Sequence, residues 1–183
     1  MPPVAADQLQ QAGGAPTVTI PRMTRTPEIT VAAVAATAGR FLFVEERINQ
    51  RLVINQPAGH VEPGESLLAA VIREVHEESA WRFQPQALLG VYLWRRPSAR
   101  RATLRFAFTG SVSEHDATRR LDRGIVRTLW LSADEVEAQA PRLRSPLVLR
   151  CVEDYLVGHT RSLEGIAQLD LSAAAGVEPT ARL

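Results

Sequence analysis

The most marked absence in this 183-residue chain is lysine, because all 21 basic residues are arginine. The 20 acidic residues nearly balance them, which leaves a formal net charge of +1 at pH 7. A chain without a strong positive field is not drawn to nucleic acid by its overall charge. Arginine is, however, the better bidentate clamp for phosphate, so groups that can bind phosphate are plentiful.

Cysteine and long apolar runs are also scarce. Cys151 is the single cysteine, which excludes an internal disulfide. No run of 18 apolar residues could cross a membrane, and the first residues lack the basic and apolar regions of a secretory signal. We therefore expect no membrane partner and a cytoplasmic location. The hydrophobic content of 45% is enough for a proper core.

The composition predicts one domain with a tail at each end. Residues 1–26 contain Pro, Gln, Ala and Gly without periodicity, so we expect a disordered leader, within which Met23 is a candidate for the true start. Residues 161–183 are expected to be a second loose tail. The domain between them spans residues 27–160, a usual length for one domain.

Strand-like and helix-like segments are interleaved in this domain. The predicted strands are 29–37, 41–47, 51–56, 88–94, 103–111 and 125–131. The predicted helices are 67–79, one that opens at Ser132 with Glu135 completing a capping box, and 145–156. Interleaving of this kind predicts an α/β fold with a sheet covered by helices on both faces.

The segment GHVEPGESLLAAVIREVHEESAW, from Gly59 to Trp81, is the most informative part of the chain. Ser66 suits an N-cap, and no Gly or Pro interrupts the next thirteen residues, so a helix is predicted there. The apolar residues of this helix recur at helical spacing and should form one stripe facing the core: Leu68, Val71, Ile72 and Val75.

Three glutamates of the same helix, Glu74, Glu77 and Glu78, fall within one turn of each other, on the flank away from this stripe. Like charges at this spacing repel by roughly 0.2–0.5 kcal/mol per pair. Alone, three glutamates on a helix most often form a solvated surface. A hard cation such as Mg²⁺ would instead be held by such oxygens together with substrate phosphates.

The spacing of the segment resembles the signature of the Nudix hydrolases: G, five residues, E, seven residues, then R-E-U-x-E-E-x-G-U, where U is bulky and apolar. Gly59, Glu65 and Arg73 are in register with the glutamates, and only Ala80 departs, standing where the family has Gly. The resemblance implies an α/β/α sandwich with a mixed sheet and a catalytic loop–helix motif. The departure at Ala80 concerns the helix end, where a left-handed residue is usual, and not the chemistry.

The resemblance also implies roles for the polar residues of the motif. The expected ligands of Mg²⁺, or of Mn²⁺, are the Glu74, Glu77 and Glu78 carboxylates and the main-chain carbonyl of Ala58. Glu65 and Arg73 are expected to pair and to hold the catalytic helix against the glycine turn, in support of the ligands.

The identity of the general base stays open at this stage. Glu77 and Glu74 are the candidates inside the motif. Some members of the family take the base from a downstream loop, where Glu114, Asp116 and Asp122 are available. A solvated loop position is the more usual fate of each downstream acid.

Several short stretches bear on the substrate. The sequence NQPAGH at 55–60 and the run FLFVEE at 41–46 resemble a branch of small bacterial Nudix phosphatases, which act on nucleoside di- and triphosphates and on hydroxymethylpyrimidine pyrophosphate. The candidate substrate contacts are Gln56, Trp94, which would stack on a ring, and Arg105, which would meet a phosphate. A core aromatic and a strand-surface arginine are the alternatives, and His60 and His76 are expected to be solvated or hydrogen-bonded.

The expected function is Mg²⁺-dependent hydrolysis of a phosphoanhydride in a small molecule, by a monomer or homodimer. Another Nudix specificity, such as ADP-ribose, and a non-catalytic nucleotide-binding domain are the alternatives. An arginine-rich nucleic-acid binder is disfavoured by the low net charge and the lack of interleaved aromatics. The residues that suggest it are Arg95, Arg96, Arg100 and Arg101.

Overall fold

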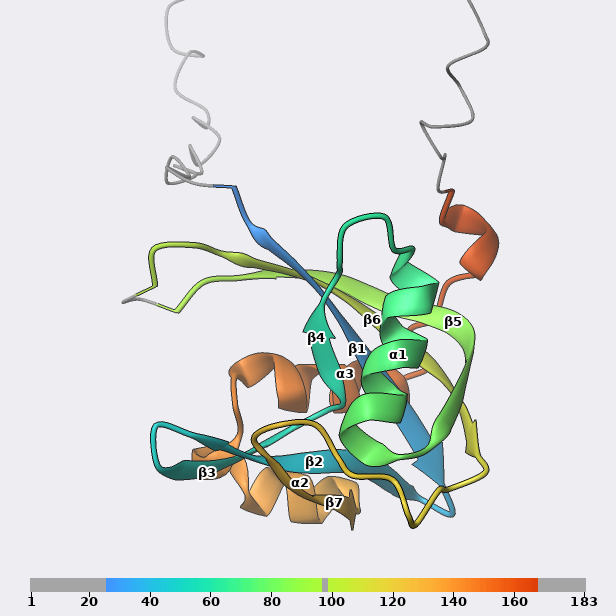
Figure 1. Ribbon diagram of the computed structural model, residues 1–183. Helices are drawn as coiled ribbons and strands as arrows, with labels where there is room; N and C mark the ends of the chain where they lie inside the picture. The colour runs from blue at the N-terminus through green and yellow to red at the C-terminus, as the bar shows by residue number, and fades with distance from the viewer. Residues whose placement is uncertain (1–25, 97–98, 168–183) are drawn as a thin grey trace, which may run out of the picture.

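The computed structural model describes residues 26–96 and 99–167 (Figure 1). Residues 1–25 and 168–183, which hold nearly all of the predicted leader and most of the predicted tail, lie outside the described residues. The strands are β1 (Glu28–Thr37), β2 (Arg40–Ile48), β3 (Arg51–Asn55), β4 (Ala58–His60), β5 (Arg82–Trp94), β6 (Thr103–Ser113) and β7 (Ile125–Leu131). The helices are α1 (Leu67–Ser79), α2 (Ala133–Ala138) and α3 (Pro146–Leu156), with 3-10 turns η1 (Ala140–Arg142) and η2 (Leu163–Gly165).

The strands form one mixed sheet of seven strands. Its main path runs β3-β2-β1-β6-β5, while β4 also pairs with β1 and β7 also pairs with β2. The pairing of β1 with β6 is parallel and the other pairings are antiparallel. The central strand β1 is buried on both faces, which accounts for its nearly continuous run of Val and Ala.

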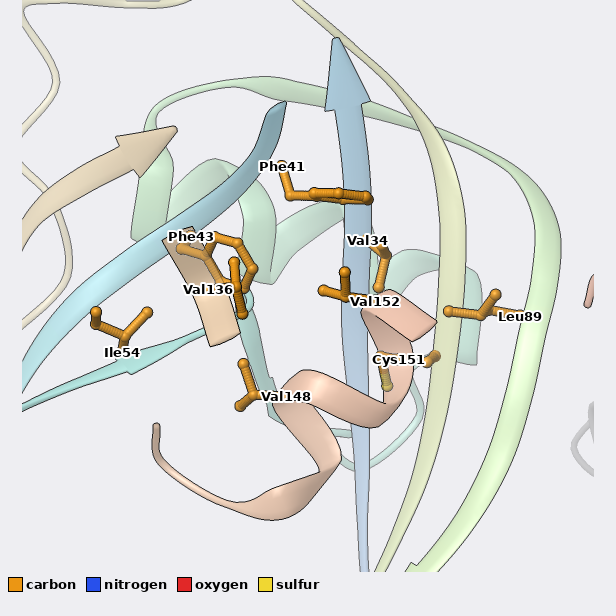
Figure 2. Packing of buried hydrophobic residues seen from close by; sticks show 10 residues of the cluster. Val34, Phe41, Phe43, Ile54, Leu89, Val136, Val148, Cys151 and Val152 are labelled. Atoms are coloured by element: carbon orange, nitrogen blue, oxygen red, sulfur yellow. The ribbon is translucent and has the colours of Figure 1, made fainter. Parts of the chain in front are cut away.

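Helices cover both faces of this sheet, so the predicted α/β/α sandwich is confirmed. Val71 and Val75 of α1 pack on one face against residues such as Phe108, and Figure 1 shows α1 in front of the sheet. The opposite face is covered by α3 and α2. Figure 2 shows the side chains of α3 directed at that face, among them Val148 and Val152.

The orientation of α1 differs from the predicted one. Ile72 was expected in the core but is 42% exposed, whereas Glu74, expected on the outer flank, is 8% exposed. The helix is rotated so that its glutamate edge faces the β4 turn, and this rotation carries Ile72 toward solvent. The consequence is that Glu74 is buried and that Glu77 and Glu78 are partly buried.

Two strands and one boundary differ from the predictions. The three-residue strand β4 overlaps the start of the signature and was not predicted, because so short a run has no periodicity. Strand β5 begins at Arg82 rather than at residue 88 and passes Pro85 at a register shift, which an edge strand tolerates. The packed domain also continues past residue 160, since Leu163 and Ile166 pack against the α1 side of the core.

In the described part of the chain, no helix has the length and hydropathy needed to cross a membrane.

Candidate active site

Both ends of α1 are fixed by specific hydrogen bonds. At its start, the Ser66 hydroxyl accepts from the Ala69 N–H at 3.0 Å, which confirms the predicted cap. At its end, Ala80 takes the left-handed conformation with φ of 60°, and its N–H donates to the His76 carbonyl at 3.0 Å. Ala80 therefore reproduces the cap that glycine provides elsewhere, at a cost of about 1 kcal/mol.

Arg73 ties the motif together. Its guanidinium donates to both carboxylate oxygens of Glu65, at 2.8 and 2.9 Å, so the ion pair implied by the resemblance is present. The same group donates to Glu74 at 2.8 Å, to Glu77 at 3.0 Å and to the His60 carbonyl at 3.0 Å. Hydrogen bonding to Arg73 holds the pKa of Glu65 below its usual range. One side chain thus joins the loop, β4 and α1.

Gly59 is required by close approach and not by its backbone angles. A Cβ atom built on Gly59 would lie 2.0 Å from the Glu74 Oε1 atom, which is far inside any real contact. The carboxylate of Glu74 therefore packs directly on the backbone of β4. Burial in this position raises the pKa of Glu74, although hydrogen bonding to Arg73 opposes the shift.

The short ladder between β1 and β4 directs the backbone of Ala58 toward α1. Two hydrogen bonds fix its alternation: Ala33 N–H to the Pro57 carbonyl at 2.9 Å and Val61 N–H to the Ile29 carbonyl at 3.3 Å. Ala58 and His60 then occupy non-hydrogen-bonded positions, so their N–H and C=O groups point away from β1. The Ala58 N–H donates to Glu78 Oε2 at 2.9 Å. Its carbonyl consequently points to the same side as the Glu78 carboxylate.

The donors gathered here are chemically suited to a hard divalent cation. They are three carboxylates and one carbonyl, all oxygen ligands of the kind that Mg²⁺ and Mn²⁺ take. Burial raises the pKa of Glu78 to about 8, with Glu74, Glu46 and Asp122 adding to the shift and the Ala58 N–H opposing it. Within residues 26–96 and 99–167, however, no three acidic, His or Cys side chains are already arranged as a metal site. Arg73 instead holds one oxygen each of Glu74 and Glu77.

The downstream acids lie at different distances from this centre. Glu114 pairs with Arg82 at 3.1 Å on the surface, and the Asp116 carboxylate accepts from Thr118. Asp122 is closer, because its N–H donates to the Glu77 carbonyl at 2.9 Å and its charge raises the pKa of Glu78. Of the three loop acids that the sequence offered as candidate bases, Asp122 is thus the one that lies near Glu77 and Glu78.

A cavity of about 510 Å³ opens beside β4. Ala58 and Gly59 line it, so it adjoins the glutamate centre. Trp94 and Arg105, two of the predicted substrate contacts, line it as well. The third, Gln56, is 1% exposed and donates through its amide to the Val148 carbonyl at 2.8 Å, and it does not line this cavity. The structure therefore places Gln56 where it fastens α3 to the sheet.

A sequence model of the NUDIX domain matches residues 24–150 of the chain. The chain belongs to the Nudix hydrolase family. Phosphatase NudJ of Escherichia coli strain K12 is 38% identical over 151 residues, which cover 82% of this chain and 97% of that protein. The Shigella flexneri phosphatase NudJ matches to the same extent.

Solved structures agree with this membership. A NUDIX hydrolase from Nitrosomonas europaea has a TM-score of 0.77 and 44% identity, and the match covers 78% of this chain and 97% of that one. An ADP-ribose pyrophosphatase from Streptococcus suis has a TM-score of 0.56 and 17% identity, with 74% and 96% covered, and it shares the fold. This Nudix hydrolase is therefore an enzyme of a family that generally uses divalent cations.

Sequence reasoning missed several polar residues that line the cavity of this Nudix hydrolase. Glu46 and Asn55 lie inside stretches that carry the family resemblance, but their types alone gave them no role. Alternation gave no usable signal for Glu46, since the burial of its neighbour Glu45 is not evident from the sequence and the register of β2 against β7 shifts between the two residues. The other missed lining residues include Thr30, Arg144 and Ser145.

Proposed function

We propose that this Nudix hydrolase uses Mg²⁺, or Mn²⁺ in its place, to cleave a phosphoanhydride bond. Its substrate would be a nucleoside di- or triphosphate, or a pyrimidine pyrophosphate similar to hydroxymethylpyrimidine pyrophosphate. The observation that carries the proposal is the arrangement of Glu74, Glu78 and the Ala58 backbone around Gly59, directly beside a cavity lined by arginine. The similarity to proteins named phosphatase NudJ supports the same class of reaction.

The metal ligands in this proposal are the Glu74, Glu77 and Glu78 carboxylates and the Ala58 carbonyl. A bound divalent cation supplies charge neutralisation at the phosphates, which otherwise repel the attacking water. Arg73 positions two of the ligands, because its Nη1 atom contacts both Glu74 at 2.8 Å and Glu77 at 3.0 Å. Gly59 allows Glu74 to lie against the backbone that carries the Ala58 carbonyl.

Glu77 is the favoured general base within the motif. Its side chain is 36% exposed, against 11% for Glu74, whereas burial raises the pKa of Glu78. A base must reach both the site and the water that it activates. Asp122 is the second candidate, since its backbone is bonded to Glu77 and its carboxylate influences Glu78.

Two other functions are weaker on specific grounds. ADP-ribose hydrolysis is the activity of the Streptococcus suis neighbour, an ADP-ribose pyrophosphatase, but at 17% identity that likeness extends to the fold alone. A purely nucleotide-binding role would be favoured by a broken ligand set. The three carboxylates of the signature are all present.

A phosphate-release assay on purified protein tests the proposal. The panel comprises nucleoside di- and triphosphates, hydroxymethylpyrimidine pyrophosphate, ADP-ribose and a sugar nucleotide, each with Mg²⁺. We expect turnover of at least one nucleotide or of the pyrimidine pyrophosphate, and faster turnover of these than of ADP-ribose. Turnover confined to ADP-ribose or to the sugar nucleotide would contradict the assigned substrate class.

A further inference from the structure

One wall of the cavity concentrates buried polar atoms that lack a hydrogen-bond partner. Among the described residues, eight buried side-chain nitrogen or oxygen atoms have no such partner, and six of them belong to five residues of this cavity. An unpaired buried polar atom is unfavourable, because it has lost its hydrogen bonds to water and gained none in the protein. Such a concentration is typical of a site where a ligand completes the hydrogen bonds. We call these residues the polar wall: Thr30, Glu46, Asn55, Arg105 and Ser145.

The orphaned atoms of the polar wall divide into donors and acceptors. Arg105, which is 7% exposed, presents two donors, Nε and Nη1. Glu46 Oε1 and Asn55 Oδ1 are two acceptors, while the hydroxyls of Thr30 and Ser145 can do either. A complementary ligand must therefore offer hydrogens to one part of the wall and lone pairs to another.

The acceptors of the wall argue against an anionic group at this place. Glu46 is half-buried and its nearest cation, Arg144, lies 3.8 Å from the carboxylate, too far for a hydrogen bond. Asn55 lies close enough to bond to Glu46 as well. A phosphate drawn to Arg105 would meet this carboxylate, whereas a neutral ring with both donors and acceptors would not be repelled.

The number of unpartnered atoms narrows the choice of ring that could bind there. Two acceptors from the paired strands β2 and β3 match the two hydrogens of an exocyclic amino group, while a ring N–H supplies one hydrogen. The two donors of Arg105 match acceptor atoms next to that amino group, as in cytosine or a 4-aminopyrimidine. Trp94 lines the same cavity and provides an aromatic face for stacking.

We propose that the polar wall selects substrates with an amino-substituted pyrimidine or purine ring, through Glu46 and Asn55 on the amino group and Arg105 on the neighbouring ring acceptor. The assignment rests on the proposed function for the pyrophosphate end of the substrate, and it makes Glu46 a specificity-determining residue. It also moves Arg105 from the phosphate, where the sequence suggested it, to the ring.

Binding of CMP and UMP to the full chain by calorimetry, with chelator present, tests this assignment. The two ligands share the phosphate and ribose and differ at the pyrimidine edge, where cytosine carries an amino group and uracil a carbonyl. We expect CMP to bind at least about tenfold more tightly. In Glu46→Gln the preference should fall below about threefold, because the Gln amide can also donate to the uracil carbonyl.

Glu28→Gln is the matched control, since Glu28 lines the outer part of the same cavity and its side chain is 43% exposed. That variant should keep the CMP preference. Arg105→Gln should weaken CMP more than UMP, whereas equal weakening of both would place Arg105 on the phosphate. Equal weakening of both ligands in Arg105→Gln would overturn the assignment. So would equal affinity of the unaltered protein for CMP and UMP, or an unchanged CMP preference in Glu46→Gln. Because binding requires no hydrolysis, these measurements test the ring assignment even if the phosphate-release assay shows no turnover.

Discussion

The Arg73 guanidinium donates to three carboxylates and a backbone carbonyl, whereas two nitrogen atoms of the buried Arg105 guanidinium have no partner. Arg73 lies on α1, in the loop–helix motif, and Arg105 lies on β6, in the wall of the cavity. In the motif, Arg73 satisfies the carboxylates around it and fixes their geometry. In the cavity, the protein leaves polar groups to be satisfied by a substrate. The difference fits the roles proposed above, with chemistry in the first region and substrate selection in the second.

The largest expected effect comes from removing one ligand charge in the motif. Glu78→Gln keeps the side-chain shape and still accepts the Ala58 N–H, so the fold should persist. Turnover should fall by about two orders of magnitude or more, because a ligand interaction needed in the transition state is lost. Glu62→Gln, at an exposed position of the same loop, should retain full turnover. The rates of phosphate release by the two variants are compared at saturating Mg²⁺. If Glu78→Gln retained most of the activity, the ligand assignment would be wrong.

A second change tests whether the motif is held by Arg73. Arg73→Lys keeps the charge but removes the forked contact with Glu65 and the branch to Glu74 and Glu77. The free energy of unfolding should fall by about 1–3 kcal/mol, and turnover should fall with it. Arg82→Lys, in an exposed ion pair, should change neither measurably. Chemical denaturation gives the comparison, and an unchanged Arg73→Lys midpoint would show that the network is dispensable.

Substitutions in the cavity should change substrate binding and leave the chemical step unaffected. Trp94→Ala should lose about 1–3 kcal/mol of binding for ring-bearing substrates, which raises KM with little change in kcat. Hydrolysis of a small pyrophosphate without a ring should barely change. Leu93→Ala, one residue earlier on β5 with a 61% exposed side chain, is the control. Equal losses for both substrates together with a lower Tm would make Trp94 a core residue.

The smallest effect concerns stability and pH. Burial raises the pKa of Glu78 to about 8 in the folded chain, whereas an unfolded glutamate ionises near its ordinary value. Between the two values the unfolded chain releases a proton that the folded chain keeps, so folding loses stability as pH rises. Without metal, Glu78→Gln should therefore melt a few degrees above the unaltered protein at pH 8. The difference should shrink toward pH 5, and a difference independent of pH would contradict the pKa assignment.

The motif was far more predictable from the sequence than the cavity. Gly59, Glu65 and Arg73 lie within one local segment, where turn and helix geometry converts spacing directly into contacts. The rotation of α1 that exposes Ile72 was missed because it depends on how the helix packs against β4, a strand too short to show a pattern.

The cavity could not be assembled from the sequence because its walls come from distant strands. Glu46 lies on β2, Asn55 on β3 and Arg105 on β6, and only the strand order brings them to one place. Of its residues, Trp94 and Arg105 were named from their types, their positions and the family resemblance of the stretches around them. Their surroundings, which decide what they bind, required the structure.

The most direct test of metal dependence is the rate of phosphate release from a substrate that the enzyme hydrolyses, measured before and after exhaustive chelation. We expect activity to vanish when divalent cations are removed and to return when Mg²⁺ or Mn²⁺ is added back, because the Glu74, Glu77 and Glu78 carboxylates act through the cation. A folded, chelated protein that keeps full turnover would contradict the central claim.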